Sequence, residues 1–492
     1  MRVARLARGA DRLGLADAEP SLPMSVAIVW FRRDLRLADN PALRAALQAH
    51  ERVLPVYIHA PDEEAPWQPG AASRWWLHHS LDALDGALRR CGTRLHMAAG
   101  PTATVLRELL SATAADAVYW NRLYEPAVTA RDASLQQTLR DAGADAHSFN
   151  ANLLFEPWEI VTAQQTPYKV FTPFWRNARA RLHVRPPLPT PRRVDGVDLA
   201  GSLAIDQLAL LPRIRWDAGF GDAWRPGEAG ALRNLRHFCA EAIGDYPSAR
   251  DLPDRPGTSR LSPHLHFGEV SPMQIAWTLQ ESAQSAKQHS GAEKFLSEIG
   301  WREFSHHLLH HFPHTPEQNL NPRFDRFVWA RDDEDHLQRW QQGRTGIPII
   351  DAGMRELWAT GWMHNRVRML TASFLAKNLR QHWLHGARWF WDTLVDADLA
   401  NNTQGWQWTA GSGADAAPYF RIFNPVTQGE KFDVNADYVR RWVPELRALP
   451  AKLIHRPWQD PARLRDCGYP EPIVDLAASR ATALAEYART AG

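Results

Sequence analysis

Four short segments in the second half of the chain combine acids, amides, arginines and indoles at helical spacing. Phe295, Glu298, Trp301 and Arg302 stand at i, i+3, i+6 and i+7, so a helix would carry them along one broad face. A carboxylate flanked by aromatic rings can have a raised pKa or can bind the polar edge of a heterocycle. The alternative is a surface ion pair between Glu298 and Arg302, the commonest result of this spacing.

A second stripe consists of Trp362, Asn365, Arg366 and Met369, at i, i+3, i+4 and i+7. An Asn amide beside Arg and Trp is suited to reading the edge of a base or another heterocycle. Residues 361–390 contain five Lys or Arg and no Asp or Glu, and tryptophans are interleaved with them. This pattern is typical of a local nucleic-acid surface, with a solvated helix face as the alternative.

The third segment, DADLANNTQGWQW at 396–408, places two acids before two amides and two tryptophans. It is too polar for a core and too rich in Trp for a surface loop, so it predicts a bound aromatic ligand. Asp396 could pair with Arg368, and Asp398 could accept a hydrogen bond from a ring N–H.

The fourth segment, GTSRLS at 257–262, offers hydroxyls, backbone N–H groups and Arg260, which suit a phosphate. Taken alone, it favours a helix N-cap.

A separate run, HHLLHHFPH at 306–314, has the i, i+4 histidine spacing that can chelate a metal. Because no H-E-x-x-H arrangement is present, we expect ordinary packing there and no metal site.

The elements that must position these residues differ between the two halves of the chain. From residue 25 to about 150, apolar β-branched runs alternate with helical stretches, which predicts a doubly wound α/β domain with a parallel sheet. The expected strands are 25–31, 52–58, 93–98 and 116–120. Neither a G-x-G-x-x-G nor a P-loop motif follows the first strand, so the usual marks of a nucleotide site are missing here.

After residue 156 the pattern changes twice. Residues 156–230 include RPPLPTPRR and few periodic runs, so they predict a connector. Helical periodicity then returns, for example at 291–312, 347–361 and 363–386, and predicts a larger all-helical domain. The expected organisation is an extension at 1–23, an α/β domain at 24–155, a linker at 156–230 and a helical domain at 231–487.

Composition limits the classes of protein to consider. The chain has 492 residues, of which 45% are hydrophobic and 23% charged, with a net charge of +2. These values exclude pervasive disorder, a coiled coil and nucleic-acid binding by bulk charge alone. Three widely spaced cysteines fit a reducing cytoplasm, and the first 23 residues do not form a secretory signal. The 22 tryptophans are either aromatic filler or a stacking and redox system, and composition leaves both open.

The motifs together carry a resemblance. From about residue 25 to 487 the chain resembles the DNA photolyase/cryptochrome family. The strings that carry the resemblance are VWFRRDLRLADNPAL, YKVFTPFW, GTSRLSPHLHFGEVSP, WREF, TGWMHNRVRMLTASFL, DLANNTQGWQW and DAAPYFRIFNPVTQGEKFD.

The resemblance implies an α/β antenna domain, a long linker and a helical domain that holds FAD. It implies that Asp396 pairs with Arg368, that Asp398 meets the isoalloxazine edge, and that Asn402 faces N5 and favours a fully reduced anionic flavin. Many members have Trp where this chain has Phe295. The implied cofactor contacts are Tyr246, Thr258, Ser259, Arg260, Leu261, Ser262, Phe295, Arg302, Asn365, Arg368, Asp396, Asp398 and Asn402.

The implied activity is light-driven repair of cyclobutane pyrimidine dimers in DNA, in which excited FADH⁻ lends an electron that splits the dimer. The lesion must leave the duplex to reach the flavin. The implied substrate contacts are Glu298, Trp301, Asn365, Met369 and Trp408 in the pocket, and Arg250, Arg366 and Gln428 on the DNA strand. The implied relay that reduces the flavin is Trp406, Trp383 and Trp329. The WMHNR string argues against the 6-4 photoproduct as substrate.

Other expectations concern the second chromophore and the rival functions. The stretch NRLYEPAVTARD lacks the folate-contacting Asn-Glu pair of some enterobacterial members. Instead, the stretch APWQPGAASRWWLHHSL resembles plant cryptochromes and the photolyase branch nearest them, and for the second chromophore we expect methenyltetrahydrofolate first, deazaflavin second and an empty site third. We expect a cytoplasmic monomer that binds damaged DNA and no membrane. The rivals are a cryptochrome photoreceptor that binds FAD without repair, and a DNA-binding protein without flavin.

Overall fold

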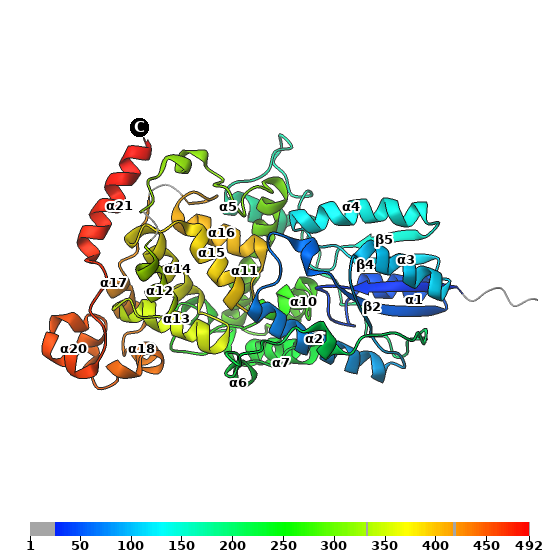
Figure 1. The fold of residues 1–492 in the computed structure, drawn as a ribbon, viewed down its shortest axis with the longest axis horizontal. Coiled ribbons are helices and arrows are strands. Elements are labelled where there is room, and N and C mark those ends of the chain that lie inside the picture. The colour runs from blue at the N-terminus through cyan, green and yellow to red at the C-terminus, as the bar shows by residue number, and fades with distance from the viewer. Residues whose placement is uncertain (1–24, 331–332, 417–419, 492) are drawn as a thin grey trace, which may run out of the picture.

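The computed structural model describes residues 25–330, 333–416 and 420–491. The extension expected at residues 1–23 lies outside these ranges. Figure 1 shows a parallel sheet with its helices at one end of the molecule and a larger helical region at the other. Within the described ranges, every helix is too short or too polar to cross a bilayer.

The sheet has five parallel strands in the order β3-β2-β1-β4-β5. The strands are β1 Val26–Phe31, β2 Arg52–His59, β3 His96–Ala99, β4 Ala117–Asn121 and β5 Asp145–Phe149. All six residues of β1 are buried, because helices cover both faces of this central strand. Its residues alternate, with Val29 and Phe31 in one apolar cluster and Ile28 and Trp30 in another.

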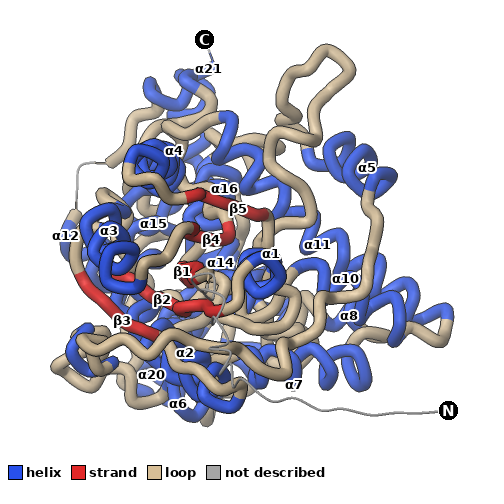
Figure 2. Tube along the Cα trace, turned by 90° about the vertical axis from the view of Figure 1, so that its right-hand side faces the viewer, coloured by secondary structure: helices blue, strands red, loops and turns tan. Residues whose placement is uncertain are grey.

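Helices α1 (Pro41–Ala49) and α2 (Ala71–Arg90) pack on one face of the sheet, and α3 (Thr102–Thr113) and α4 (Pro126–Asp141) on the other (Figure 2). The predicted doubly wound α/β fold is confirmed. The third strand begins three residues later than expected. Strand β5 is not among the expected strands, because this half-exposed edge strand has no apolar run.

The connector after the sheet contacts both halves of the molecule. It contains α5 (Phe171–Arg181), which the sequence did not predict, and Phe171 stacks on Trp301 with ring centroids 3.7 Å apart. The chain then returns to the α/β half, where the Leu203 amide donates to the Met97 carbonyl oxygen at 2.8 Å. The limits 24–155, 156–230 and 231–487 stay a prediction.

The remaining chain is helical. Its main helices are α7 Glu228–His237, α8 Tyr246–Ala249, α9 Ser262–His266, α10 Pro272–Ser282, α11 Ala286–His311, α12 Glu334–Gln341, α13 Pro348–Thr360, α14 Asn365–Ser373, α15 Trp383–Thr393, α16 Leu399–Ala410, α17 Pro425–Phe432, α18 Asp437–Trp442, α20 Pro461–Cys467 and α21 Leu476–Ala491. The sequence predicts helical periodicity throughout 363–386, but the structure has no continuous helix over these residues. After α14 comes a π-helical turn, Phe374–Asn378, and then Arg380 in the left-handed conformation (φ 50°), which ends the helix.

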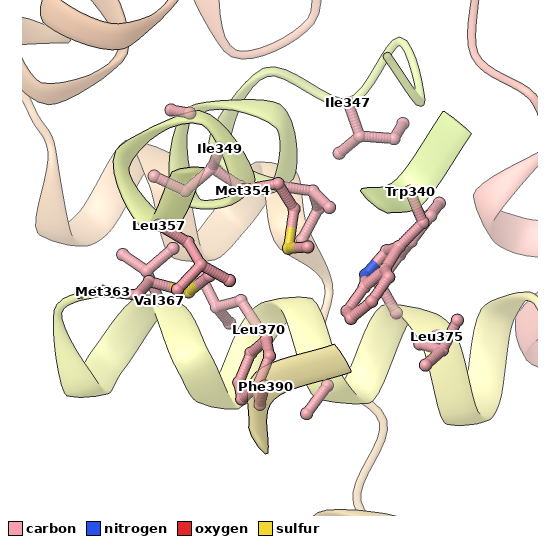
Figure 3. Packing of buried hydrophobic residues seen from close by; sticks show 14 of the residues in the cluster. Trp340, Ile347, Ile349, Met354, Leu357, Met363, Val367, Leu370, Leu375 and Phe390 are labelled. Carbon is pink, nitrogen blue, oxygen red and sulfur yellow. The ribbon is translucent and has the colours of Figure 1, made fainter. Parts of the chain in front are cut away.

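The core of the helical half lies between α13 and α14. Figure 3 shows Met354 and Leu357 of α13 beside Leu370 of α14, with Trp340 and Phe390 closing the cluster. Trp340 is fully buried, and its indole N–H donates to the Thr371 carbonyl oxygen at 3.1 Å. This indole is therefore packed filler with a satisfied polar atom, as buried Trp requires.

Candidate active site

A cavity of about 820 Å³ opens among α11, α14, α16 and the segment before α9. Ligand cavities for cofactors commonly measure a few hundred to about 1,000 Å³, so this one could hold a large ligand. The predicted residues that line it are Arg250, Ser259, Leu261, Ser262, Phe295, Glu298, Trp301, Arg302, Asn365, Arg366, Arg368, Met369, Asp396, Asp398, Asn402, Trp406 and Trp408. The four segments singled out by spacing thus meet at one place.

The remaining predicted residues lie outside the described lining of this cavity. Tyr246 packs edge-on against Phe295, with ring centroids 5.3 Å apart, and so supports the wall from behind. Arg260 has a left-handed backbone (φ 52°), and its guanidinium lies between the rings of Trp224 and Trp362, 4.3 and 4.4 Å from their centroids. Thr258, Gln428, Trp383 and Trp329 also lie elsewhere.

The N-cap interpretation of residues 257–262 is wrong. Helix α9 starts at Ser262, and Leu261 stands at its N-cap position without a side-chain cap. The Ser259 hydroxyl instead accepts from the Leu261 amide at 3.3 Å, and both serines line the cavity. The Ser262 hydroxyl accepts from the Trp362 indole N–H at 3.4 Å, so neither serine hydroxyl caps helix α9.

Asp396 and Asp398 provide fixed negative charge inside the cavity. Arg368 Nη2 lies 2.8 Å from Asp396 Oδ2, as the sequence predicted, and Arg368 Nε donates to the Met363 carbonyl oxygen at 2.7 Å. The other oxygen, Asp396 Oδ1, is buried and has no hydrogen-bond partner among the described residues. A buried acceptor without a donor is costly, so this atom is suited to an N–H or O–H donor from a ligand.

Asp398 is the N-cap of α16, where one carboxylate oxygen accepts from the Asn401 amide at 2.8 Å. Its second oxygen lies 3.5 Å from His306 Nε2 and 3.7 Å from His266 Nδ1. Burial alone would raise the pKa of this carboxyl, but His306, His266 and Arg302 around it hold the pKa well below its usual range. Asp398 is therefore ionised and accepts hydrogen bonds.

The histidine run at residues 306–314 is part of the packing around Asp398. His307 uses both ring nitrogens: Nδ1 lies 2.9 Å from the Pro157 carbonyl oxygen, and Nε2 accepts from the Tyr168 amide at 3.0 Å. Burial lowers the pKa of His307 to about 4, so this ring is neutral. His266 and His306 are not predicted as partners of Asp398, because neither is close to it in the sequence.

Two indoles form apolar walls near the cavity mouth. Trp301 is fixed from behind by Phe171, with an interplanar angle of 11°. Trp408 donates its indole N–H to the Asp415 carbonyl oxygen at 3.1 Å, which fixes the orientation of this ring. Met369 also lines the cavity. Flat indole walls suit a planar or fused ring system, since they offer large apolar area with few rotatable bonds.

Charged residues surround the mouth. Arg250 Nη2 lies 3.0 Å from Glu298 Oε2, and Arg250 Nη1 also contacts Glu298 Oε1. Arg302 instead donates to the Asn152 carbonyl oxygen at 2.6 Å, so the predicted alternative of a Glu298–Arg302 surface pair is wrong. Lys294 is a partner of Glu298 that is not among the predicted residues, although its i, i+4 spacing to Glu298 is a usable signal.

The three tryptophans predicted to form a relay occupy different positions relative to the cavity. Trp406 lines the cavity and packs against Gly386 of α15. Trp383, three residues before Gly386, is fully buried and donates its indole N–H to Asn319 Oδ1 at 3.1 Å. The His382 ring lies 5.6 Å from Trp383 and 4.9 Å from Trp329, which is partly buried. The position of the His382 ring between these two indoles is not predicted from the sequence.

Comparisons with known proteins add independent findings. Residues 27–192 match the family model described as DNA photolyase, and residues 295–489 match the model described as FAD binding domain of DNA photolyase. The chain is 48% identical over 477 residues to a deoxyribodipyrimidine photo-lyase of Agrobacterium fabrum, covering 95% of this chain and 98% of that protein. It is 39% identical to cryptochrome-1 of Arabidopsis thaliana, covering 92% of this chain and 69% of that protein.

A comparison of folds agrees with these matches. The crystal structure of a bacterial class III photolyase from Agrobacterium tumefaciens superposes with a TM-score of 0.92 at 47% identity. The match covers 97% of this chain and 99% of that one.

Proposed function

The chain belongs to the DNA photolyase/cryptochrome family, and we propose that the cavity among α11, α14 and α16 is where it repairs DNA. Its activity is that of a deoxyribodipyrimidine photo-lyase, a light-driven repair enzyme. One observation carries the assignment of the site: two indole walls and Glu298 share a single cavity with the ionised Asp398 and the unpartnered oxygen of Asp396.

The residues present fit FAD. Asp396 Oδ1 lacks a donor and Asp398 is an ionised acceptor, so one end of the cavity suits the N–H groups of a polar heterocycle. The Asn402 amide nitrogen donates to the Ala387 carbonyl oxygen at 3.0 Å, which leaves its side-chain oxygen for the ligand. When bound, FAD supplies the absorption of light and the electron for repair.

The cofactor contacts that we propose include residues outside the lining. Ser259, Leu261 and Ser262 would hold the phosphate and ribitol region directly, with Thr258 and Arg260 shaping that loop. Tyr246 would support Phe295. The other proposed contacts are Arg302, Asn365, Arg368, Asp396, Asp398 and Asn402.

The substrate is proposed to be a cyclobutane pyrimidine dimer turned out of the duplex. Trp301 and Trp408 would enclose the fused pyrimidines, and Glu298 would contact their polar edge. Asn365 and Met369 would complete the pocket. A damaged pair stacks poorly, so turning it out costs less than for an intact pair, and this difference supplies selectivity. Arg250, Arg366 and Gln428 would contact the strand backbone.

The relay is proposed to run from Trp406 through Trp383 to Trp329. Its support is that Trp406 lines the cavity, that Trp383 is buried, and that the His382 ring lies close to both Trp383 and the partly buried Trp329. The relay would restore the reduced state of the flavin and is separate from repair itself.

A second chromophore remains a proposal, with methenyltetrahydrofolate first and deazaflavin second. A cavity of about 150 Å³ lies between the α/β and helical halves and is lined by Trp67, Trp391, Glu64 and Gln318, among others. At the carboxyl ends of the strands, Arg32 already stacks 4.5 Å from the Trp30 ring centroid, and the cavity there measures about 60 Å³. Both cavities are smaller than the few hundred cubic ångströms that cofactor sites commonly measure, and we propose the first as the folate site because it is the larger of the two.

A variant tests this placement. Trp67→Ala should remove any absorbance band that the purified protein carries beyond those of flavin, while leaving FAD bound. Persistence of that band in the variant would refute the placement.

The rival function is a cryptochrome photoreceptor that binds FAD without repair. The complete pocket of Glu298, Trp301, Asn365, Met369 and Trp408, together with Asn402, favours repair. We also propose that the protein acts as a cytoplasmic monomer. Cys91, Cys239 and Cys467 are all free thiols, which fits a reducing compartment.

Illumination of the reduced protein with DNA that contains thymine dimers tests the function. The expected result is restoration of thymine monomers only in the light. Glu298→Ala should lower the repair yield and leave FAD bound, because Glu298 lies at the mouth and Asp396 and Asp398 lie at the other end. Loss of FAD from this variant would refute the proposed role of Glu298, and absence of repair by the wild type would refute the function.

A further inference from the structure

Glu298 has two cationic partners at the mouth of the cavity. Arg250 contacts both of its carboxylate oxygens, and Lys294 Nζ lies 3.0 Å from Glu298 Oε1. The three side chains differ in exposure: Arg250 is 16% exposed, Glu298 23% and Lys294 41%. The carboxylate therefore has one more cation than its charge requires, and the outer cation is a flexible lysine.

The same rim carries a second pair. Arg366 Nη2 lies 2.7 Å from Asp251 Oδ1, so Asp251 already holds the neighbouring arginine. Together the rim has three cations, Arg250, Lys294 and Arg366, and two anions, Glu298 and Asp251. One positive charge is left over, which is the charge that a single phosphodiester group would neutralise.

Arg250 is the cation best suited to leave Glu298 for such a phosphate. A guanidinium binds phosphate oxygens through two parallel hydrogen bonds, as it now binds the carboxylate, whereas an ammonium acts as a point charge. If Arg250 were the only partner of Glu298, its departure would strand a carboxylate beside an apolar wall. An unpaired, partly buried charge of this kind is costly.

We propose that Lys294 is a positioning residue that holds the Glu298 carboxylate when Arg250 moves to a backbone phosphate of the damaged strand. This inference rests on the proposed function, and it adds a residue and an exchange of partners to it. In this role Lys294, which also lines the cavity, acts through the Glu298 carboxylate. It is one helical turn from Glu298 on α11, so it can follow the carboxylate without a change of backbone.

The test compares Lys294→Met and Lys294→Arg with Lys287→Met. Lys287 lies on the same helix and pairs with Asp245 at 2.7 Å, outside the described lining of the cavity, so its substitution controls for a lost surface charge. We expect Lys294→Met to lower the repair yield of bound substrate about two- to fivefold, the range typical of a partly exposed ion pair. Lys294→Arg should restore the yield, and Lys287→Met should leave it unchanged.

Lys294→Met combined with Glu298→Gln distinguishes a positioning role of Lys294 from a direct contact between Lys294 and DNA. In Glu298→Gln protein the carboxylate is gone, so Lys294→Met should cause no further loss of yield. Affinity for undamaged DNA, measured across a series of salt concentrations, should fall equally in Lys294→Met and Lys287→Met. A loss of yield that persists in the Glu298→Gln background, or a loss confined to affinity, would overturn the inference.

The proposed exchange of partners at Glu298 also predicts that a substitution of Arg250 affects DNA binding and repair yield differently. Arg250→Gln should weaken binding and reduce its salt dependence, because a phosphate contact is lost, yet preserve the yield of bound substrate while Lys294 is present. A collapse of that yield would show that Arg250 cannot leave Glu298. If the wild-type protein repairs no dimers at all, the proposed function fails. If it repairs them and Lys294→Met behaves like Lys287→Met, only this inference fails.

Discussion

Replacing Gly386 by alanine should displace Trp406 and slow light-driven reduction of the flavin. A Cβ atom at position 386 would lie 2.0 Å from Trp406 Cη2 and 2.6 Å from Leu375 Cδ2. Carbon atoms in contact prefer about 3.5–4.0 Å, so the ring or the backbone of α15 must move. Trp406 is only 2% exposed and has Phe390 and Trp340 on other sides, with ring centroids 5.0 and 6.2 Å away.

The expected magnitude is a difference of two terms. Overpacking a well-filled core costs about 1–3 kcal/mol, and the short contact to a buried indole places this site near the upper value. Alanine is about 1 kcal/mol better than glycine in a helix, which offsets part of that cost. The net loss in the free energy of unfolding is then about 2 kcal/mol, equivalent for a chain of this length to a Tm lower by about 2 °C.

Two assays on flavin-loaded protein check this reasoning. Thermal unfolding gives the change in Tm, and the absorbance of oxidised flavin under light with an external reductant gives the rate of photoreduction. Gly86→Ala in α2 is the matched control, because a Cβ there meets Arg90 Nη1 at an ordinary 3.7 Å. The control should keep the rate of photoreduction and gain stability. If Gly386→Ala matches the control in both assays, the packing of Trp406 on α15 does not matter for the relay.

Three further perturbations have definite outcomes. Trp406→Phe should block light-driven reduction but spare repair by chemically pre-reduced enzyme, and loss of both activities would contradict the relay. Burial lowers the pKa of Lys377 from 10.5 to about 7, so the native state binds fewer protons than the unfolded state between these values and stability rises with pH there. Lys377→Met should therefore raise the urea midpoint more at about pH 6 than at about pH 9, and an equal gain at both would refute the shift. Asp396→Asn leaves Arg368 without its carboxylate and should reduce FAD retention on gel filtration, whereas retention equal to wild type would show that the pair is dispensable.

The sequence was most informative where interacting residues share a short motif. Arg368 and Asp396 belong to two such motifs, and the resemblance placed both in one site, so their ion pair was predicted and is present. The Glu298–Arg302 alternative followed from helical spacing alone and is wrong. Arg302 donates to the Asn152 carbonyl oxygen, 150 residues away in the sequence, and helical spacing carries no signal for that contact.

Local patterns also failed where burial is incomplete. Strand β5 is an edge strand with half-exposed residues, so its sequence has no continuous apolar run to mark it. The run at 363–386 has helical periodicity throughout, yet Arg380 adopts a left-handed conformation that only the tertiary structure determines. Composition likewise could not divide the tryptophans into filler and function. In the structure Trp340 is core, whereas Trp301 and Trp408 line the cavity.

The two ends of the cavity need different kinds of charge compensation. Asp396 and Asp398 are buried, so their partners must be fixed: Arg368 is held by the Met363 carbonyl oxygen, and Asp398 is tied into the first turn of α16. Glu298 is partly exposed, and water lowers the cost of exchanging its partners. A site that must retain one ligand and release another requires this division. In the function that we propose, permanent pairs suit the end that would keep the cofactor, and exchangeable pairs suit the mouth through which damaged DNA would enter and repaired DNA would leave.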